Sequence, residues 1–224
     1  MVGVTAGLAA QAPTAPPAAP PPGPVHLVTY LEVVPPAGER AAAALRRYRG
    51  AARRAPGNLR VEALRALTRP GHFALVEAWQ DQAALDAHRA SPRRAEITDV
   101  VAQDGVAPPD ERLLKNTIAA GLTTDVDPAG AVWVLTHADA LPPATRGSSL
   151  LLPLAERSRT EPGCLRFDVL VQPTRLNHFT VVEVWRNRKA LEAHVAAPYT
   201  RAFRAEFLKV TGALYDERLY SAIR

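Results

Sequence analysis

The alternation of apolar and polar residues predicts the same order of strands and helices twice along the chain. Short runs rich in β-branched and aromatic residues indicate strands, and longer runs rich in Ala, Leu and Arg indicate helices. Asp81 and Asn187 stand where N-caps are expected. In the first half the expected strands are 25–34, 59–68, 72–80 and 111–118, and the expected helices are 37–54, 82–90 and 92–103. In the second half the matching segments are 131–138, 145–160, a hairpin turn at 175–177, 188–196, 198–210 and 215–223.

The second half copies the first at a constant distance of 106 residues. The segment from His72 to Pro92, HFALVEAWQDQAALDAHRASP, returns from His178 to Pro198 as HFTVVEVWRNRKALEAHVAAP. Between Pro56 and Pro92, 18 of 37 aligned positions are identical, so the chain is a tandem duplication. We divide it into an Ala/Pro-rich N-terminal segment (1–24), a first repeat (25–118), a linker (119–130) and a second repeat (131–224).

Each repeat has the order β, α, β, β, α, β, which is the ferredoxin-like split βαβ arrangement. On the strand 72–80, the face with Phe73 and Trp79 and the face with Ala74 and Val76 are both largely apolar. Both faces should therefore be covered, one by helices and the other by the sheet of the other repeat. The predicted fold class is α+β, with two ferredoxin-like βαββαβ repeats packed sheet to sheet as a fused dimeric α+β barrel.

The composition argues against a nucleic-acid binder and against a disulfide or zinc scaffold. The formal charge is +5 and the pI is near 9.8, partly because of a run of Arg residues within 46–54. Tyr48 is the only aromatic residue in that run, so a solvated helix face is favoured over a nucleic-acid surface. Cys164 is the single cysteine and cannot form a disulfide within the chain. We expect no metal site.

The N-terminal segment leaves the location of the protein open. Residues 2–10 are apolar and end in an Ala-Gln-Ala pattern that a signal peptidase could cleave, but no Lys or Arg precedes them. A Pro/Ala tract follows at 13–24 and reads as an extended spacer. No run of 18 apolar residues is present, so we expect no membrane span. We expect a cytoplasmic protein, or an exported one if residues 1–12 belong to a signal peptide.

The phrases VEAWQDQAALDAHRASP and VEVWRNRKALEAHVAAPYTRAF resemble the signature of the antibiotic biosynthesis monooxygenase (ABM) family, which includes quinol monooxygenases. The shared features are a Glu and an aromatic residue two apart on a strand, then Ala-Leu, Ala-His and Pro. The resemblance implies a dimeric α+β barrel, fused here into one chain, with a pocket in each repeat between sheet and helices. It also implies cofactor-independent oxidation of phenols or hydroquinones by O2. The expected partners are a small aromatic substrate and O2. The chain is expected to form a pseudo-dimer by itself, either as a monomer or as a dimer of such units.

Two histidines are the candidate catalytic residues. Dioxygen accepts one electron at a time, so an unaided oxygenase needs an electron-rich substrate anion and hence a base beside an apolar pocket. His88 and His194 fit this role, because imidazole can take a phenolic proton near neutral pH. Each lies on the short helix after the third strand. The alternative is a helix His bonded to a neighbouring backbone carbonyl.

Aromatic residues are the candidate substrate wall, and the second half has more of them. A Trp on the strand before the short helix could stack on a flat substrate, or could simply pack in the core. The ungapped alignment pairs Tyr30 with Thr136 and Leu31 with His137. If only one pocket works, we expect it to be the second. The expected substrate-binding residues are Trp185, Trp79, Phe203, Phe207, Tyr199, Tyr30 and His137.

Glu77 and Glu183 each lie in an otherwise apolar strand and therefore need a partner. We expect a hydrogen bond or salt bridge that ties the two halves together. Arg60 and Arg166, which both repeats carry on the neighbouring strand, are the expected partners.

The sequence thus predicts a monooxygenase that oxidises a hydroquinone or polycyclic phenol. The first alternative is a non-catalytic α+β barrel that binds a small apolar ligand or serves as an assembly module. An RNA-binding module has the same element order, but it is disfavoured because the chain lacks the aromatic pair with adjacent Gly and basic residues that such modules use.

Overall fold

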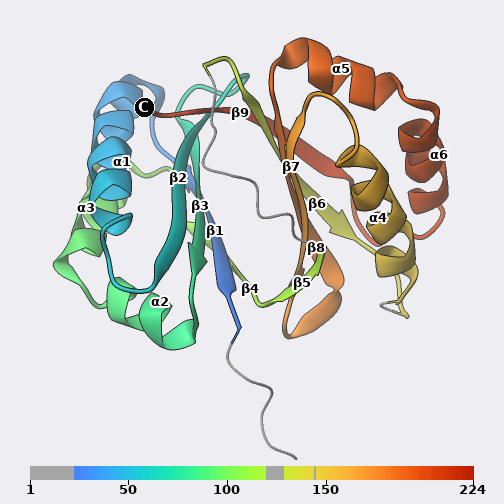
Figure 1. Ribbon diagram of the computed structural model, residues 1–224. Coiled ribbons are helices and arrows are strands. Elements are labelled where there is room, and N and C mark those ends of the chain that lie inside the picture. Colours follow the sequence, from blue (N-terminus) through green and yellow to red (C-terminus); the bar gives the residue numbers. More distant parts are fainter. Residues whose placement is uncertain (1–22, 120–128, 144) are drawn as a thin grey trace, which may run out of the picture.

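A computed structural model describes residues 23–119, 129–143 and 145–224 (Figure 1). The predictions for the N-terminal segment and for most of the linker lie outside the described residues. The first repeat contains β1 (Val25–Glu32), η1 (Pro35–Ala37), α1 (Gly38–Ala52), β2 (Asn58–Ala66), β3 (His72–Trp79), α2 (Gln82–Arg89), η2 (Pro92–Arg94), α3 (Ala95–Asp104), β4 (Asp110–Leu114) and β5 (Asn116–Ala119). The second contains β6 (Val132–Asp139), α4 (Thr145–Ser158), β7 (Cys164–Gln172), β8 (Arg175–Trp185), α5 (Arg188–Ala196), α6 (Pro198–Phe207) and β9 (Asp216–Ala222).

The strands form a nine-stranded antiparallel sheet in the order β4-β1-β3-β2-β9-β6-β8-β7-β5. The last strand of each repeat joins both halves. β9 pairs with β6 of its own repeat and with β2 of the first, while β4 pairs with β1 and the adjoining β5 pairs with β7. Figure 1 shows the strands in the middle, with α1–α3 on one outer side and α4–α6 on the other. The predicted fused α+β barrel is confirmed.

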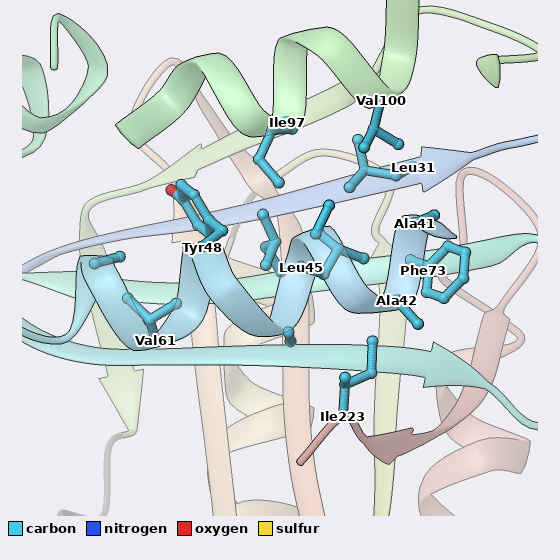
Figure 2. Close-up of a cluster of buried hydrophobic side chains, with 14 of the residues drawn as sticks. Leu31, Ala41, Ala42, Leu45, Tyr48, Val61, Phe73, Ile97, Val100 and Ile223 are labelled. Carbon is cyan, nitrogen blue, oxygen red and sulfur yellow. The ribbon is translucent and has the colours of Figure 1, made fainter. Parts of the chain in front are cut away.

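Three buried clusters follow from the two-faced strands. One lies between the first half of the sheet and α1–α3. It contains Phe73, which Figure 2 shows, and Trp79. A second lies in the matching place in the second repeat. The third fills the barrel interior with residues from both repeats, among them Ala74 and Val76. The predicted division of the third strand into a helix face and a barrel face is therefore confirmed.

The ungapped alignment of the repeats fails at the first strand. Val25 pairs with Trp79 and Val132 pairs with Trp185, so the two tryptophans are 106 residues apart but their partners are 107 apart. The structural counterpart of Tyr30 is therefore His137, and the predicted pairing with Thr136 is wrong. The second repeat is one residue shorter between its first strand and its first helix. A slip of one residue moves a strand side chain to the opposite face of the sheet.

Candidate functional site

The second-repeat site is built around His194 on α5. The His194 ring stacks on the Trp185 indole, with centroids 4.5 Å apart and planes 27° apart. Trp185 Nε1 donates a hydrogen bond to Glu183 Oε2 at 2.8 Å, and His194 Nε2 lies 4.0 Å from the same oxygen. Asn187 caps α5 by accepting a hydrogen bond from the Ala190 N–H at 2.9 Å. This cap begins the helix directly after β8, which sets the imidazole against the indole.

The other nitrogen of His194 faces a polar cluster. His194 Nδ1 lies 3.1 Å from Glu161 Oε1, in the turn after α4. The Tyr199 hydroxyl donates to the same Glu161 oxygen and lies 3.3 Å from His194 Nδ1, and Thr200 Oγ1 lies 3.5 Å from it. The Arg157 guanidinium lies over the Tyr199 ring at 4.5 Å. His194 therefore lies between two carboxyl groups, Glu161 and Glu183.

Burial sets the charges in this site. Loss of solvation raises the pKa of Glu183 from its ordinary value of 4.5 to about 8. The hydrogen bond from the Trp185 N–H stabilises the carboxylate and opposes this rise. Burial also lowers the pKa of His194, and the Glu161 carboxylate opposes that effect. Near neutral pH, Glu183 is therefore largely a protonated acid beside a neutral imidazole. Among the described residues, no Arg or Lys forms an ion pair with Glu183.

The first-repeat site starts from the same residues but is filled by a tyrosine. His88 stacks on Trp79 with centroids 4.4 Å apart. The hydroxyl of Tyr48, a fully buried residue of α1, donates to Glu77 Oε1 at 2.6 Å and lies 2.9 Å from His88 Nε2. Arg94 Nη1 donates to that hydroxyl at 3.2 Å and lies 3.8 Å from Glu77 Oε2. Burial, with Arg94 and Arg93 nearby, lowers the pKa of His88 to about 4.

The aligned positions explain the difference between the sites. Tyr48 aligns with Leu154, and Ala55 aligns with Glu161. In the first repeat a Tyr hydroxyl donates to the buried Glu and an Arg lies 3.8 Å from it, whereas in the second repeat no Arg or Lys of the described residues forms an ion pair with the acid and the His gains a carboxylate. Sequence reasoning missed both Tyr48 and Glu161, because each comes from an element far along the chain from the repeated motif.

Two predicted substrate-binding residues lie elsewhere. Tyr30 and His137 contact each other edge to face, with ring centroids 5.2 Å apart. Both lie on the barrel face of their strands, opposite the face that carries the helix-side sites, and the Arg218 guanidinium lies over the Tyr30 ring at 4.9 Å. Their predicted place beside the Trp and His residues is therefore wrong. For His137 the error follows from the one-residue slip, because the ungapped alignment pairs it with Leu31, a residue of the helix-side cluster.

The phenylalanines of α6 do lie near the second site. Phe203 and Phe207 have ring centroids 5.4 Å apart and belong to the same buried cluster as Trp185. Tyr215 contacts both rings edge to face. These rings form an apolar wall on the helix side of the second repeat.

The predicted interaction of Glu77 and Glu183 with Arg60 and Arg166 is wrong. Glu77 and Glu183 face the helices of their own repeats, whereas Arg60 and Arg166 point into the barrel with the side chains of their strands. Arg60 Nε lies 3.5 Å from Glu62 Oε1, and Arg166 Nε donates to Asp168. The Arg60 guanidinium lies 5.6 Å from the centroid of the Trp133 ring. A cation–π contact across the barrel therefore links the halves.

Three clefts on the surface lie away from His88 and His194. Two adjoining clefts of about 170 Å³ each share His72, Arg218 and Tyr220. A third, of about 310 Å³, is lined by residues that include Arg46, Arg65 and Ile223. The imidazoles of His88 and His194 are 4% and 3% exposed, so each site is closed in this conformation.

Within the described part of the chain, no group of three or more His, Cys, Asp or Glu residues is placed to hold a metal ion. No helix in that part is long and apolar enough to cross a membrane. The basic run within 46–54 is neutralised in part. Arg49 and Arg53 both bond to Glu62, and Arg47 pairs with Glu96 at 2.9 Å.

Sequence comparison assigns the family. A family model described as antibiotic biosynthesis monooxygenase matches residues 24–99 and 148–206, which is more than half of the chain and includes part of each repeat. The chain belongs to the antibiotic biosynthesis monooxygenase (ABM) family. The resemblance noted in the sequence is therefore confirmed.

Solved structures share the duplicated ABM fold. A proposed monooxygenase of Fusobacterium nucleatum aligns with a TM-score of 0.82 at 16% identity, over 91% of this chain and 94% of its own. An anthrone oxidase-like protein aligns with a TM-score of 0.65 at 16% identity, over 90% of this chain and 92% of its own. At these identities the likeness shows the fold alone.

One relative has a closer but shorter match. An uncharacterized protein of Synechocystis sp. is 46% identical over 48 residues, which cover 21% of this chain and 33% of that protein. The match therefore spans about a third of the relative's length.

Proposed function

We propose that the protein is a monooxygenase that oxidises a hydroquinone or polycyclic phenol with O2, without a cofactor, and that the second repeat carries the reaction. Membership of the ABM family and the fold shared with proposed monooxygenases support the reaction class. The observation that carries the assignment to the second repeat is the buried pair of Glu183 and His194. The location, cytoplasmic or exported, and the assembly, a monomer or a dimer of whole chains, stay predictions.

The chemistry requires a base, an acid and an apolar wall. The base takes the phenolic proton, and the phenolate gives one electron to O2 to form a substrate radical and superoxide. These combine to make a carbon–oxygen bond, and the peroxide takes a proton. Loss of water then leaves a new carbonyl. In total a CH2 group and O2 become C=O and H2O, or a hydroquinone and O2 become a hydroxyquinone and H2O, and the substrate supplies all four electrons.

The second repeat offers a residue for each role. His194 is neutral near pH 7, so its imidazole is free to accept a proton. Glu183 holds a proton in the same pH range and can deliver it to the peroxide. Trp185, Phe203 and Phe207 provide flat apolar surface for an aromatic substrate. Substrate entry requires movement of α5 or α6, because both ionisable groups are buried.

The first repeat is a weaker candidate. Tyr48 fills the space between Glu77 and His88, and the pKa of His88 is lowered to about 4. An imidazole with so low a pKa binds a proton weakly at pH 7. We therefore propose that this copy mainly stabilises the fold.

The matched histidines provide the test. O2 uptake would be measured with reduced menadiol and with an anthrone for the wild type, His194→Ala and His88→Ala. We expect His194→Ala to lower kcat by about 10²–10⁴-fold, the usual contribution of a general acid or base, and His88→Ala to leave kcat within a few-fold.

Two outcomes would contradict the proposal. Wild-type uptake at the rate of buffer alone for every substrate would exclude the oxidation of these substrate classes. If those substrates nevertheless bind, the protein is a non-catalytic barrel that holds a small apolar ligand. Equal losses in the two variants would place the reaction in both repeats.

A further inference from the structure

Glu161 connects the buried His194 to the solvent. Its side chain is 19% exposed, whereas those of His194 and Glu183 are 3% and 6% exposed. Two backbone hydrogen bonds hold the residue in its turn, from the Glu161 N–H to Ser158 O at 3.1 Å and from the Cys164 N–H to Glu161 O at 3.0 Å. The carboxylate therefore stands in a fixed place at the edge of the buried site.

The hydrogen bonds at Glu161 determine which nitrogen of His194 carries the proton. An ionised carboxylate only accepts hydrogen bonds, so Nδ1 must donate across the 3.1 Å contact. The Tyr199 hydroxyl also donates to this oxygen. The lone pair of a neutral His194 then lies on Nε2, the nitrogen that faces Glu183.

We propose that Glu161 is a positioning residue of the second repeat, which holds His194 in the Nδ1–H tautomer and carries protons between His194 and solvent. The inference deepens the proposed function and rests on it, because it assigns no separate reaction. It adds a third ionisable group to the pair of His194 and Glu183.

The groups that face His194 support this role. Glu183 faces it from β8 and Glu161 from the turn after α4, while α6 contributes Tyr199, Thr200 and Arg204. Burial and Arg204 lower the pKa of His194, and Glu161 is the group that raises it. Loss of the Glu161 charge would therefore leave a weaker base.

The first repeat is a natural comparison. Ala55 stands at the position that aligns with Glu161. Correspondingly, His88 Nδ1 has no hydrogen-bond partner among the described residues, and its other nitrogen faces Tyr48. The contact between a carboxylate and Nδ1 of the helix histidine is therefore found at His194 and not at His88 among the described residues.

Titration of the imidazoles by NMR tests the inference without a substrate. The full chain would be labelled with ¹⁵N-histidine, and the His194 signal would be assigned from a His194→Gln variant. In the wild type we expect neutral His194 to carry its proton on Nδ1. In Glu161→Gln the amide oxygen still accepts that hydrogen bond, so the tautomer should persist while the pKa of His194 falls by about one pH unit or more. In Glu161→Leu both the tautomer preference and the pKa should change.

Controls separate this role from a structural one. The titration of His88 should be unchanged in both variants, and Tyr199→Phe should retain the Nδ1–H tautomer because it keeps the carboxylate. A wild-type His194 protonated on Nε2 would overturn the inference, as would a Glu161→Gln variant whose His194 titrates as in the wild type.

The proposed function can fail separately. Wild-type O2 uptake at the buffer rate would remove the reaction but leave the titration result standing. If the wild type does turn over, Glu161→Gln should lower kcat at pH 7 by roughly tenfold with KM little changed, because the base is weakened while the substrate wall is intact.

Discussion

At the scale of single residues, the two repeats place the same Glu, Trp and His motif among different neighbouring side chains. Glu77 and Glu183 occupy the same strand position, and each precedes a Trp that stacks on a His. The difference comes from residues outside the motif. Glu77 accepts a hydrogen bond from Tyr48 and has Arg94 3.8 Å from its other oxygen, while Glu183 receives one N–H from Trp185. Burial raises the pKa of both acids, and Glu183 stays largely protonated at neutral pH. The same buried acid therefore has different hydrogen-bond partners in the two repeats.

A first prediction concerns the buried acid. Between its ordinary pKa of 4.5 and its folded value of about 8, the folded protein holds a proton on Glu183 that the unfolded chain has released. The free energy of unfolding should therefore fall as the pH rises through this range. Glu183→Gln keeps an acceptor for the Trp185 N–H and removes the titration. We expect the variant to be more stable than the wild type at pH 8 by about 1–3 kcal/mol, and equal to it or less stable near pH 4.5.

Urea unfolding at a series of pH values measures this difference. Glu192→Gln is the control, since Glu192 lies exposed on α5 and its replacement should change stability by less than about 0.5 kcal/mol. A constant difference between Glu183→Gln and the wild type from pH 5 to pH 8 would show that Glu183 is ionised throughout.

Sequence reasoning placed the Glu, Trp and His of the repeated motif on one strand and on the helix after it, but it did not find the residues that contact them. The stacking of His194 on Trp185 follows from a strand, a cap and one short helix, which are local features. Glu161 and Tyr48 reach their sites from other helices and turns, so no spacing in the sequence connects them to the motif. The one available signal was the difference between Ala55 and Glu161 at aligned positions, beside matching Pro-Gly pairs.

At the scale of elements, local signals placed the helix starts and the hairpins. The predicted N-caps at Asp81 and Asn187 are confirmed, with side-chain hydrogen bonds from the Ala84 and Ala190 N–H groups at 2.8 and 2.9 Å. Gly71 has φ of 82° in the turn between β2 and β3, a conformation that favours glycine. The end of the first strand was less well predicted, because its register depends on its partner strand.

The cap of α5 has a testable contribution. Asn187→Ala removes the acceptor for the Ala190 N–H and should lower the free energy of unfolding by about 1 kcal/mol. Because α5 carries His194, the variant should also weaken the stacking on Trp185, which Trp fluorescence quenching by the imidazole would report.

Asn187→Asp is the matched control. Aspartate is an equally good cap, so the free energy of unfolding of this variant should stay within about 0.5 kcal/mol of the wild type. Its Trp fluorescence should be that of the wild type. Equal destabilisation by both changes would indicate that the Asn amide has a role other than the cap.

At the scale of the whole molecule, the two repeats are parts of one folding unit. β9 pairs with β2 of the first repeat, and Ile223 beyond it is buried in the first repeat's helix-side core (Figure 2). The Ile223 N–H donates to Ala63 O at 2.8 Å. The end of the second repeat therefore completes the core of the first.

The pairing of β9 with β2 and the burial of Ile223 in the first repeat predict a single cooperative unfolding transition. Ile223→Ala should lower the free energy of unfolding by about 2–4 kcal/mol and should shift the transitions of both repeats together. Urea denaturation followed by Trp fluorescence and by far-ultraviolet circular dichroism would measure this. Leu214→Ala is the control, because Leu214 is 92% exposed and its loss should have little effect. Two separated transitions in Ile223→Ala would show that the repeats fold independently.

The sequence by itself determined the duplication, the order of the elements, the two faces of the third strand and the family. These properties depend on local periodicity and on the repetition of a motif. Only the tertiary structure decided which elements meet: the exchange of the last strands, the place of Tyr30 and His137 inside the barrel, and the different partners of Glu77 and Glu183. The physical reason is that pairing register and burial are set by contacts between segments far apart in the chain, and burial determines the proton affinities on which the proposed chemistry depends.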